Sequence, residues 1–238
     1  MLQRLDMNEY GKIATLSKNI PYHRAHFGSV IDGSLPGIIF VDSLHDPANV
    51  VIIPDDGFCY LICNTDVKKF LTDCHAYFFT EHKVSMVEVI CSQKVVIDSI
   101  HVLFGDRPYF NILRNAYSLD TAAFLTMKKP EISQASLNID RTENVISAFL
   151  TVSDKPIGEC RAWVYEGEAE IDIYIEKEHR QKGYAFYATH AFLSYCIQND
   201  ICPKWHCWED NVESNRLAQK CGFRLDSTFD VFIYDADA

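Results

Sequence analysis

The strongest pattern of apolar and polar positions lies between residues 170 and 199. Apolar and polar side chains alternate from 170 to 176, and this period of two predicts a strand with one buried and one polar face. From 184 to 199 neither Gly nor Pro interrupts the chain, and small or apolar residues recur every three or four positions, as one face of a helix requires. The pattern therefore predicts a strand, a short turn and a helix that begins just after Gly183.

The turn between this strand and helix is basic and contains a glycine. The first N–H groups of a helix have no partner within the helix and carry a partial positive charge, and a residue without Cβ lets a phosphate approach the backbone. The turn can therefore bind an anion, although a basic turn that only faces solvent fits the same residues. Its sequence is Arg180-Gln181-Lys182-Gly183-Tyr184-Ala185.

A second strand and a second helix follow downstream. An apolar and aromatic run of strand length covers 203–208. Asn211 is a good helix N-cap, and Gly222 is a good helix C-cap. The order strand, basic turn, helix, strand, helix is therefore predicted for 170–222.

In this order and spacing, the two segments resemble the core of the GNAT family of acetyl-CoA-dependent N-acetyltransferases. The resemblance rests on the turn 180–185 and on a downstream series of residues, and it covers about 145–232. The run 205–211 resembles a bacterial branch that includes zwittermicin-type antibiotic N-acetyltransferases. The downstream series is Asn211, Ser214, Leu217, Lys220, Gly222 and Phe223.

The family implies a fold and a function. It implies a mixed α/β (α+β) fold with a splayed, mostly antiparallel central sheet flanked by helices, and acetyl transfer from acetyl-CoA, as co-substrate, to a primary amine. Backbone groups of Ile173 and Ile175 are expected to pair with the pantetheine, the amides of 181–185 to bind the pyrophosphate, and Asn211 to contact the pantetheine arm. The isoleucines can equally be core residues and Asn211 only a cap. The expected cofactor-binding residues are Ile173, Ile175, Arg180, Gln181, Lys182, Gly183, Tyr184, Ala185 and Asn211.

Acetyl transfer to an amine requires a general base, because an amine at neutral pH is mostly protonated. Glu170 is the best candidate, since it stands on the polar face of the strand where some members of the family carry a base. Asp172 and Tyr174 share that face and are alternatives. An exposed strand residue without a catalytic role would give the same pattern.

The sequence departs from the family at the general acid. Many GNAT enzymes carry a Tyr on the final helix that hydrogen-bonds the CoA sulfur, and the matching position here is Ala218. On a helix that begins after Asn211, Ser214 shares a face with Ala218 and is the nearest replacement donor. A role restricted to bonding a backbone group in the first helical turn is an equal alternative.

The first 130 residues contain no motif that we can tie to chemistry. Asp66 predicts the N-cap of one helix and Ser92 the start of another. We predict an N-terminal α/β domain over 1–130 and the acetyltransferase domain over 131–238, with 109 as an earlier boundary. Short apolar runs bounded by turn residues predict strands at 37–41, 50–54, 58–63, 86–91 and 109–117, and a meander of strands at 145–152 and 157–165 with turns at 153–156 and 166–168.

Composition predicts a folded protein of the cytoplasm. The chain has 238 residues and is 48% hydrophobic, and we see neither a signal-peptide pattern nor an apolar run near the ~20 residues that cross a bilayer. Nine cysteines, several within apolar runs, fit a reducing compartment. We expect no metal site, because His206 and Cys207 are adjacent on a strand and point to opposite faces.

The net charge of −11 is concentrated in the second half of the chain. Residues 1–130 carry 14 acidic and 12 basic side chains, whereas 131–238 carry 19 and 10. Such a half repels nucleic acid and attracts a cationic amine, although the charge can also serve only solubility. We expect a small-molecule amine acceptor, neither a nucleic-acid nor a membrane partner, and leave a homodimer open. The alternative function is a CoA-binding or regulatory protein on the same fold without turnover.

Overall fold

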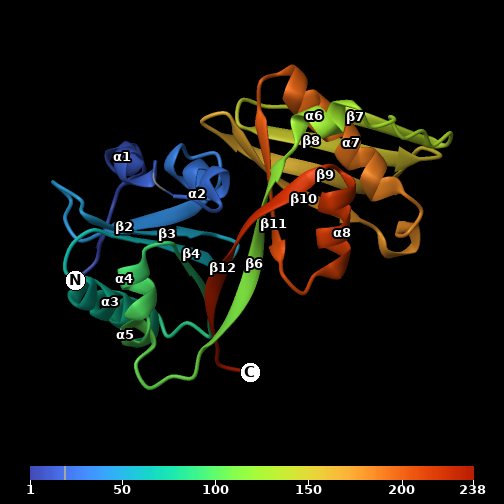
Figure 1. Cartoon of the computed structure of the whole chain (residues 1–238). Coiled ribbons are helices and arrows are strands. Elements are labelled where there is room, and N and C mark those ends of the chain that lie inside the picture. The colour runs from blue at the N-terminus through green and yellow to red at the C-terminus, as the bar shows by residue number, and fades with distance from the viewer. Residues whose placement is uncertain (19) are drawn as a thin grey trace. The chain divides into compact units, whose positions relative to one another are not determined.

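The protein is described here by a computed structural model that covers residues 1–18 and 20–238. The chain forms two compact units (Figure 1), and the chain ends pack in the same one. The first unit comprises Met1–Leu113 with Phe229–Ala238, and the second comprises Arg114–Thr228. The compact units thus divide the chain elsewhere than at the expected domain limits, 1–130 and 131–238, which stay a prediction.

The second unit has a mostly antiparallel sheet, which confirms the predicted fold class. Its strands lie in the order β6-β11-β10-β9-β8-β7. Only the neighbours β10 and β11 in this order are parallel, and the other four neighbouring pairs are antiparallel. The strands span Phe110–Leu119 (β6), Ala135–Arg141 (β7), Val145–Val152 (β8), Lys155–Tyr165 (β9), Glu168–Ile175 (β10) and Cys202–Trp208 (β11).

Two tight turns join the meander β8-β9-β10. Ser153 and Asp154 have φ of 50° and 65°, and Glu166 and Gly167 have φ of 46° and 78°. Two residues with positive φ match the twist of an antiparallel hairpin. The turns are therefore shorter than the predicted 153–156 and 166–168, and the residues left over belong to β9 and β10.

The two helices predicted after the basic turn and after Asn211 are confirmed. Helix α7 spans Tyr184–Gln198 and α8 spans Val212–Lys220, and Figure 1 shows both beside the sheet of this unit. The apolar face of α7, including Ala188, Phe192 and Cys196, is buried in the core that the strands line. A short helix, α6 (Thr121–Leu125), precedes β7. The sequence pattern missed β7, whose central apolar residues are only Leu137 and Ile139.

The first unit also combines a sheet with helices, as predicted. Its strands lie in the order β1-β2-β3-β4-β5-β12, and α3 connects the parallel strands β4 and β5. The side chain of Asp66 caps α3, as expected, but the helix predicted to open at Ser92 has Gln93 as its N-cap. The strands span Gln3–Arg4 (β1), Gly37–Val41 (β2), Asn49–Pro54 (β3), Phe58–Cys63 (β4), Met86–Cys91 (β5) and Phe223–Asp235 (β12).

The helices of the first unit are mostly short. The sequence pattern did not predict η1, α1 and α2, which precede β2, or α5, which precedes β6. These helices have too few turns to establish a helical period. Within residues 1–18 and 20–238, no helix is long and apolar enough to cross a membrane. The helices are η1 (Met7–Ile13), α1 (Ala14–Ser17), α2 (Arg24–Ile31), α3 (Val67–His75), η2 (Ala76–Glu81), α4 (Lys94–Asp98) and α5 (His101–Phe104).

Candidate functional site

The site of the second unit lies where β10 and β11 separate. Their parallel ladder runs from the pair Glu168–Cys202 to the pair Glu170–Lys204 and ends there, although both strands continue for four or more residues. β10 stays paired to β9 as far as Ile175. One edge of β10 beyond Glu170 is therefore left without a strand partner, which leaves backbone groups available to a ligand.

A cavity of about 690 Å³ opens along this edge, and its volume falls within the roughly 300–1,000 Å³ of small-molecule sites. Its lining residues come mainly from the ends of β10 and β11 and from the helices α7 and α8. Lys182 and Tyr184 are not among the lining residues. The predicted residues that line it are Ile173, Ile175, Arg180, Gln181, Gly183, Ala185, Asn211 and Ser214.

The basic turn is held in a defined conformation at the end of β10. Arg180 Nε donates a hydrogen bond to the carbonyl oxygen of Ile175 at 2.9 Å. Gln181 and Gly183 both have left-handed backbones, with φ of 60° and 86°. Gly183 is the N-cap of α7, and a Cβ added there would meet no atom within 4 Å. The open space in front of the first amides of α7 is suited to an anionic group.

The charges that line the cavity are mainly positive, although this half of the chain is acidic. Four cationic side chains line it, against the carboxylates of Asp172 and Glu213. Lys220 Nζ lies 4.5 Å from the ring centroid of Phe186, which is a cation–π distance. A lining with this balance of charge favours an anionic ligand. The cations are Arg114, Arg180, Arg216 and Lys220.

Asn211 and Ser214 are linked at the start of α8. Asn211 Oδ1 accepts a hydrogen bond from the backbone N–H of Ser214 at 3.0 Å, so Asn211 is a helix cap as well as a lining residue. Ser214 Oγ accepts a bond from the indole Nε1 of Trp205 at 3.1 Å. Because this bond uses a lone pair of the hydroxyl, its proton can be donated elsewhere. Ala218 is fully buried.

Asn215, which sequence reasoning missed, fixes α8 to the sheet. Its Oδ1 accepts bonds from Tyr117 Oη at 2.5 Å and from Asn115 Nδ2 at 2.8 Å. Its Nδ2 donates to the carbonyl oxygen of Trp208 at 3.0 Å and to that of Asn211 at 2.8 Å. One side chain therefore joins β6, the end of β11 and the first turn of α8, and sets the position of the cavity wall.

Glu170 lies beside the cavity and faces a histidine. Glu170 Oε1 is 3.2 Å from His206 Nδ1, and their side chains are only 12% and 6% exposed. Glu170 is therefore not an exposed strand residue. His206 lines the cavity, whereas Glu170 does not, so the imidazole connects the carboxylate with the cavity. Of the alternatives, Asp172 and Tyr174 line the cavity and are exposed.

Comparison with known proteins finds similarity to one family over part of the chain. A family model described as GNAT acetyltransferase matches residues 149–232. The uncharacterized N-acetyltransferase YdfB of Bacillus subtilis is 23% identical over 257 residues, which cover 98% of this chain and 98% of that protein. The finer resemblance to the zwittermicin-type branch stays a prediction.

Solved structures share the fold over nearly the whole chain. A GCN5-related N-acetyltransferase-like protein from Streptococcus suis has a TM-score of 0.67 and 16% identity, covering 94% of this chain and 98% of that one. A tandem GNAT protein from the clavulanic acid biosynthesis pathway has a TM-score of 0.68 and 11% identity, covering 99% and 98%. At these identities the structural likeness shows the fold alone.

Proposed function

We propose that this protein moves an acetyl group from acetyl-CoA to a primary amine, by direct attack in a ternary complex. The proposal is supported by the match of residues 149–232 to the GNAT acetyltransferase model. The observation that carries the proposal is the cavity of about 690 Å³ where the β10–β11 ladder ends. It joins an unpaired strand edge, an open helix N-terminus and a cationic lining in one place. Acetyl-CoA supplies the acetyl group as a thioester and is itself an anion with a long amide-bearing arm.

The residues of the cavity fit this co-substrate. The edge of β10 that includes Ile173 and Ile175 offers backbone groups to the amides of the pantetheine. The amides of the turn 181–185 and the first turn of α7 bind the pyrophosphate, with Arg180 and Lys182 adding positive charge. Asn211 contacts the pantetheine arm from the other wall.

The proton of the acceptor ammonium group leaves through Glu170. Its carboxylate is held 3.2 Å from the His206 imidazole, and the imidazole lines the cavity. A histidine can accept a proton on one ring nitrogen while a carboxylate orients the other. We therefore assign Glu170 as the base that acts through His206 or through water, with Asp172 as the alternative.

Ser214 is the proposed hydrogen-bond donor to the CoA sulfur. Ser214 lines the cavity, and its hydroxyl accepts the Trp205 indole N–H, which leaves the hydroxyl able to act as a donor. A serine hydroxyl is too weak an acid to protonate a thiolate efficiently. Because a CoA thiolate is already a good leaving group, we expect a slow but real enzyme.

The proposed acceptor is the amine of a small cationic molecule. The support is the net charge of −9 over residues 131–238, which carry 19 acidic and 10 basic side chains, together with the exposed Asp172 at the cavity. All nine cysteines are free thiols and eight are buried, which supports action in the reducing cytoplasm.

One observation favours a second function, a protein that binds CoA without turnover. Ala218 stands where many members of the family carry the tyrosine acid, and it is fully buried. The two functions differ in a single assay. The assay measures the release of free CoA thiol from acetyl-CoA in the presence of each member of a library of primary amines. An acetyltransferase is expected to release the thiol faster with cationic amines than it does by hydrolysis without an amine. Binding of CoA by calorimetry without amine-dependent thiol release would favour the second function.

A further inference from the structure

The two units repeat one arrangement of elements. In the first, β2, β3 and β4 are antiparallel, β4 and β5 are parallel with α3 in their connection, and α4 follows β5. In the second, β8, β9 and β10 are antiparallel, β10 and β11 are parallel with α7 in their connection, and α8 follows β11. Each unit also has an antiparallel strand on the far side of β5 or β11. By this order, β4 corresponds to β10 and the N-cap of α4 to the N-cap of α8.

The turns before α3 and α7 differ in length and charge. Between β10 and α7 lie residues 176–183, which end in Gly183, whereas between β4 and α3 lie only Asn64, Thr65 and Asp66. Asp66 takes the place of Gly183, with the same left-handed backbone and φ of 39°. Its Oδ1 accepts a hydrogen bond from the backbone N–H of Lys69 at 3.2 Å. A carboxylate thus stands at the helix end where, in the second unit, the space is open.

A side chain also bridges the edge of β4 beyond its ladder. The parallel pairing of β4 with β5 ends at Leu61 and Cys91. Two residues further on, the backbone N–H of Cys63 donates to Gln93 Oε1 at 2.7 Å, and Gln93 Nε2 donates to the carbonyl oxygen of Cys63 at 2.7 Å. One amide satisfies both backbone groups, as a neighbouring strand or the amide of a pantetheine arm does. Gln93 is the N-cap of α4, the position that Asn211 occupies on α8.

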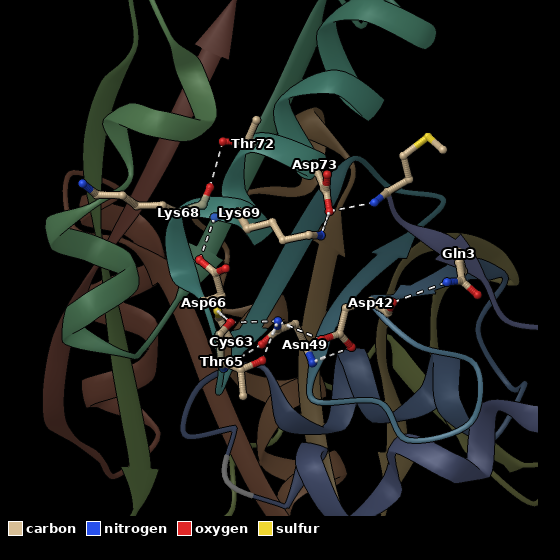
Figure 2. A network of polar contacts seen from close by, with 11 residues as sticks. Gln3, Asp42, Asn49, Cys63, Thr65, Asp66, Lys68, Lys69, Thr72 and Asp73 are labelled. Atoms are coloured by element: carbon tan, nitrogen blue, oxygen red, sulfur yellow. Dashed lines mark hydrogen bonds and ion pairs between the residues drawn. The ribbon is translucent and has the colours of Figure 1, made fainter.

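The short turn is fixed by further bonds, several of which are drawn in Figure 2. Asn49 Oδ1 accepts from the backbone N–H groups of Asn64 at 2.8 Å and Thr65 at 3.0 Å. Asn49 Nδ2 donates to Asp42 Oδ2 and to the carbonyl oxygen of Thr65, both at 2.9 Å. Asn49 is 3% exposed. The amides that would face a pyrophosphate are therefore committed to a buried side chain.

We infer that the first unit is a second copy of the acetyltransferase fold whose cofactor position is filled by the chain itself, with Gln93 in place of the pantetheine amide and Asp66 in place of the pyrophosphate. Each chain then binds one acetyl-CoA, in the second unit. The assignment of the cofactor to the second unit rests on the proposed function. The hydrogen bonds that fill the first unit do not depend on it.

The first test is the stoichiometry of CoA binding by calorimetry. The wild-type protein is expected to bind one equivalent of CoA per chain, and the Gly183→Asp variant, shown to be folded by circular dichroism, to bind it on the order of 100-fold more weakly. Two equivalents, or one equivalent that Gly183→Asp binds with unchanged affinity, would overturn the inference. If the wild-type protein binds no CoA, the proposed function fails, and the inference is then judged by the second test alone.

The second test is amide hydrogen exchange of the protein without ligand. In Gln93→Ala, the amide of Cys63 is expected to exchange at least about tenfold faster than in the wild type, because it loses its acceptor. Gln93→Glu keeps that acceptor and is expected to retain the protection if Gln93→Ala proves too unstable to measure. Gln134→Ala removes the same groups from an exposed glutamine and is the matched control. Unchanged exchange of Cys63 in a folded Gln93→Ala variant would overturn the inference.

Discussion

Gly183 combines a left-handed backbone with open space, and these two properties give opposite expectations for substitution. Its φ is 86°, yet a Cβ would meet no atom within 4 Å. Asn and Asp tolerate the left-handed region better than other residues with a Cβ. A substitution at this position therefore tests the space in front of α7 with little disturbance of the fold.

Gly183→Asp is expected to weaken acetyl-CoA binding by on the order of 3 kcal/mol, because it places a carboxylate at the helix N-terminus that is proposed to bind the pyrophosphate. Gly183→Asn has nearly the same size without the charge and is expected to lose much less affinity. Calorimetry at fixed salt measures both. Equal affinities of Gly183→Asp and the wild type, with the fold intact, would contradict the placement of the pyrophosphate.

Glu170→Gln is expected to lower kcat/KM by about 100-fold, a typical contribution of a general base. The variant keeps the size and the proximity to His206 but removes the proton acceptor. Glu168→Gln makes the same change two residues earlier on β10 and is expected to leave kcat/KM near the wild-type value. If Glu170→Gln keeps wild-type kinetics while Asp172→Asn loses activity, the base is Asp172.

Ser214→Ala is expected to lower kcat by roughly tenfold, which corresponds to about 1.4 kcal/mol, with little change in melting temperature. The backbone N–H of Ser214 stays bonded to Asn211 in this variant, so the helix cap is retained. Steady-state kinetics and a thermal melt distinguish the two roles. Loss of stability with unchanged kcat would assign Ser214 to the structure around Trp205 alone.

At the residue scale, the sequence predicts what local spacing determines. Gly183 and Asn211 are recognisable because each lies at a fixed distance from a strand and a helix. The place of His206 in the site was not recognisable, because it depends on the parallel register that pairs Glu170 with Lys204. No local pattern encodes that register. Arg114 comes from β6, far upstream in the sequence, and reaches the cavity only through pairing with β11.

At the element scale, the end of β10 packs closely against β9. Gly158 on β9 pairs with Ile175. A Cβ at Gly158 would overlap the carbonyl oxygen of Tyr174 and come within 2.6 Å of Ile175 Cδ1. The glycine therefore allows the end of β10 to lie against β9.

Gly158→Ala is expected to destabilise the protein by about 1–3 kcal/mol, because the neighbouring backbone must move to admit the methyl group. The affinity for acetyl-CoA falls as well, since Ile175 lines the cavity. Gly11→Ala adds the same methyl group where no atom lies within 4 Å and is the control. Chemical denaturation and calorimetry measure the two effects. Wild-type stability and affinity in Gly158→Ala would show that the strand end moves freely.

Elements with several periods of a pattern were predictable and short ones were not. The bounds of β2, β4, β5 and α7 agree with prediction to within a residue, because Gly, Asp, Ser or a cap delimits each run. Helices of four residues such as α1 and α5 provide barely one turn, and their packing rather than their sequence stabilises them.

At the scale of the whole molecule, the repeat of the two units was invisible in the sequence. What repeats is the backbone pairing, which many side chains satisfy, whereas the turns before α3 and α7 differ in length and in charge. Gln93 and Asn211 hold corresponding caps yet make different bonds. Only the topology identifies the first unit as a copy of the second.

The charge of the whole chain leads to the last prediction. Residues 131–238 carry 19 acidic and 10 basic side chains, whereas the cavity is lined mainly by cations. We therefore expect the acidic surface to attract a cationic acceptor and the cavity to attract an anionic co-substrate. Salt screens charges at the surface with a Debye length of about 10 Å at 0.1 M.

With acetyl-CoA saturating, kcat/KM for a polyamine such as spermidine is expected to fall several-fold between about 50 and about 500 mM NaCl, because salt screens the attraction of the acidic surface. A monoamine of similar length, with a single charge, is the control and is expected to show a shallower dependence. The slope of log kcat/KM against ionic strength is the measurement for each. If the two slopes are equal, or if both are zero, surface charge does not select the acceptor, and the specificity must come from the shape of the site.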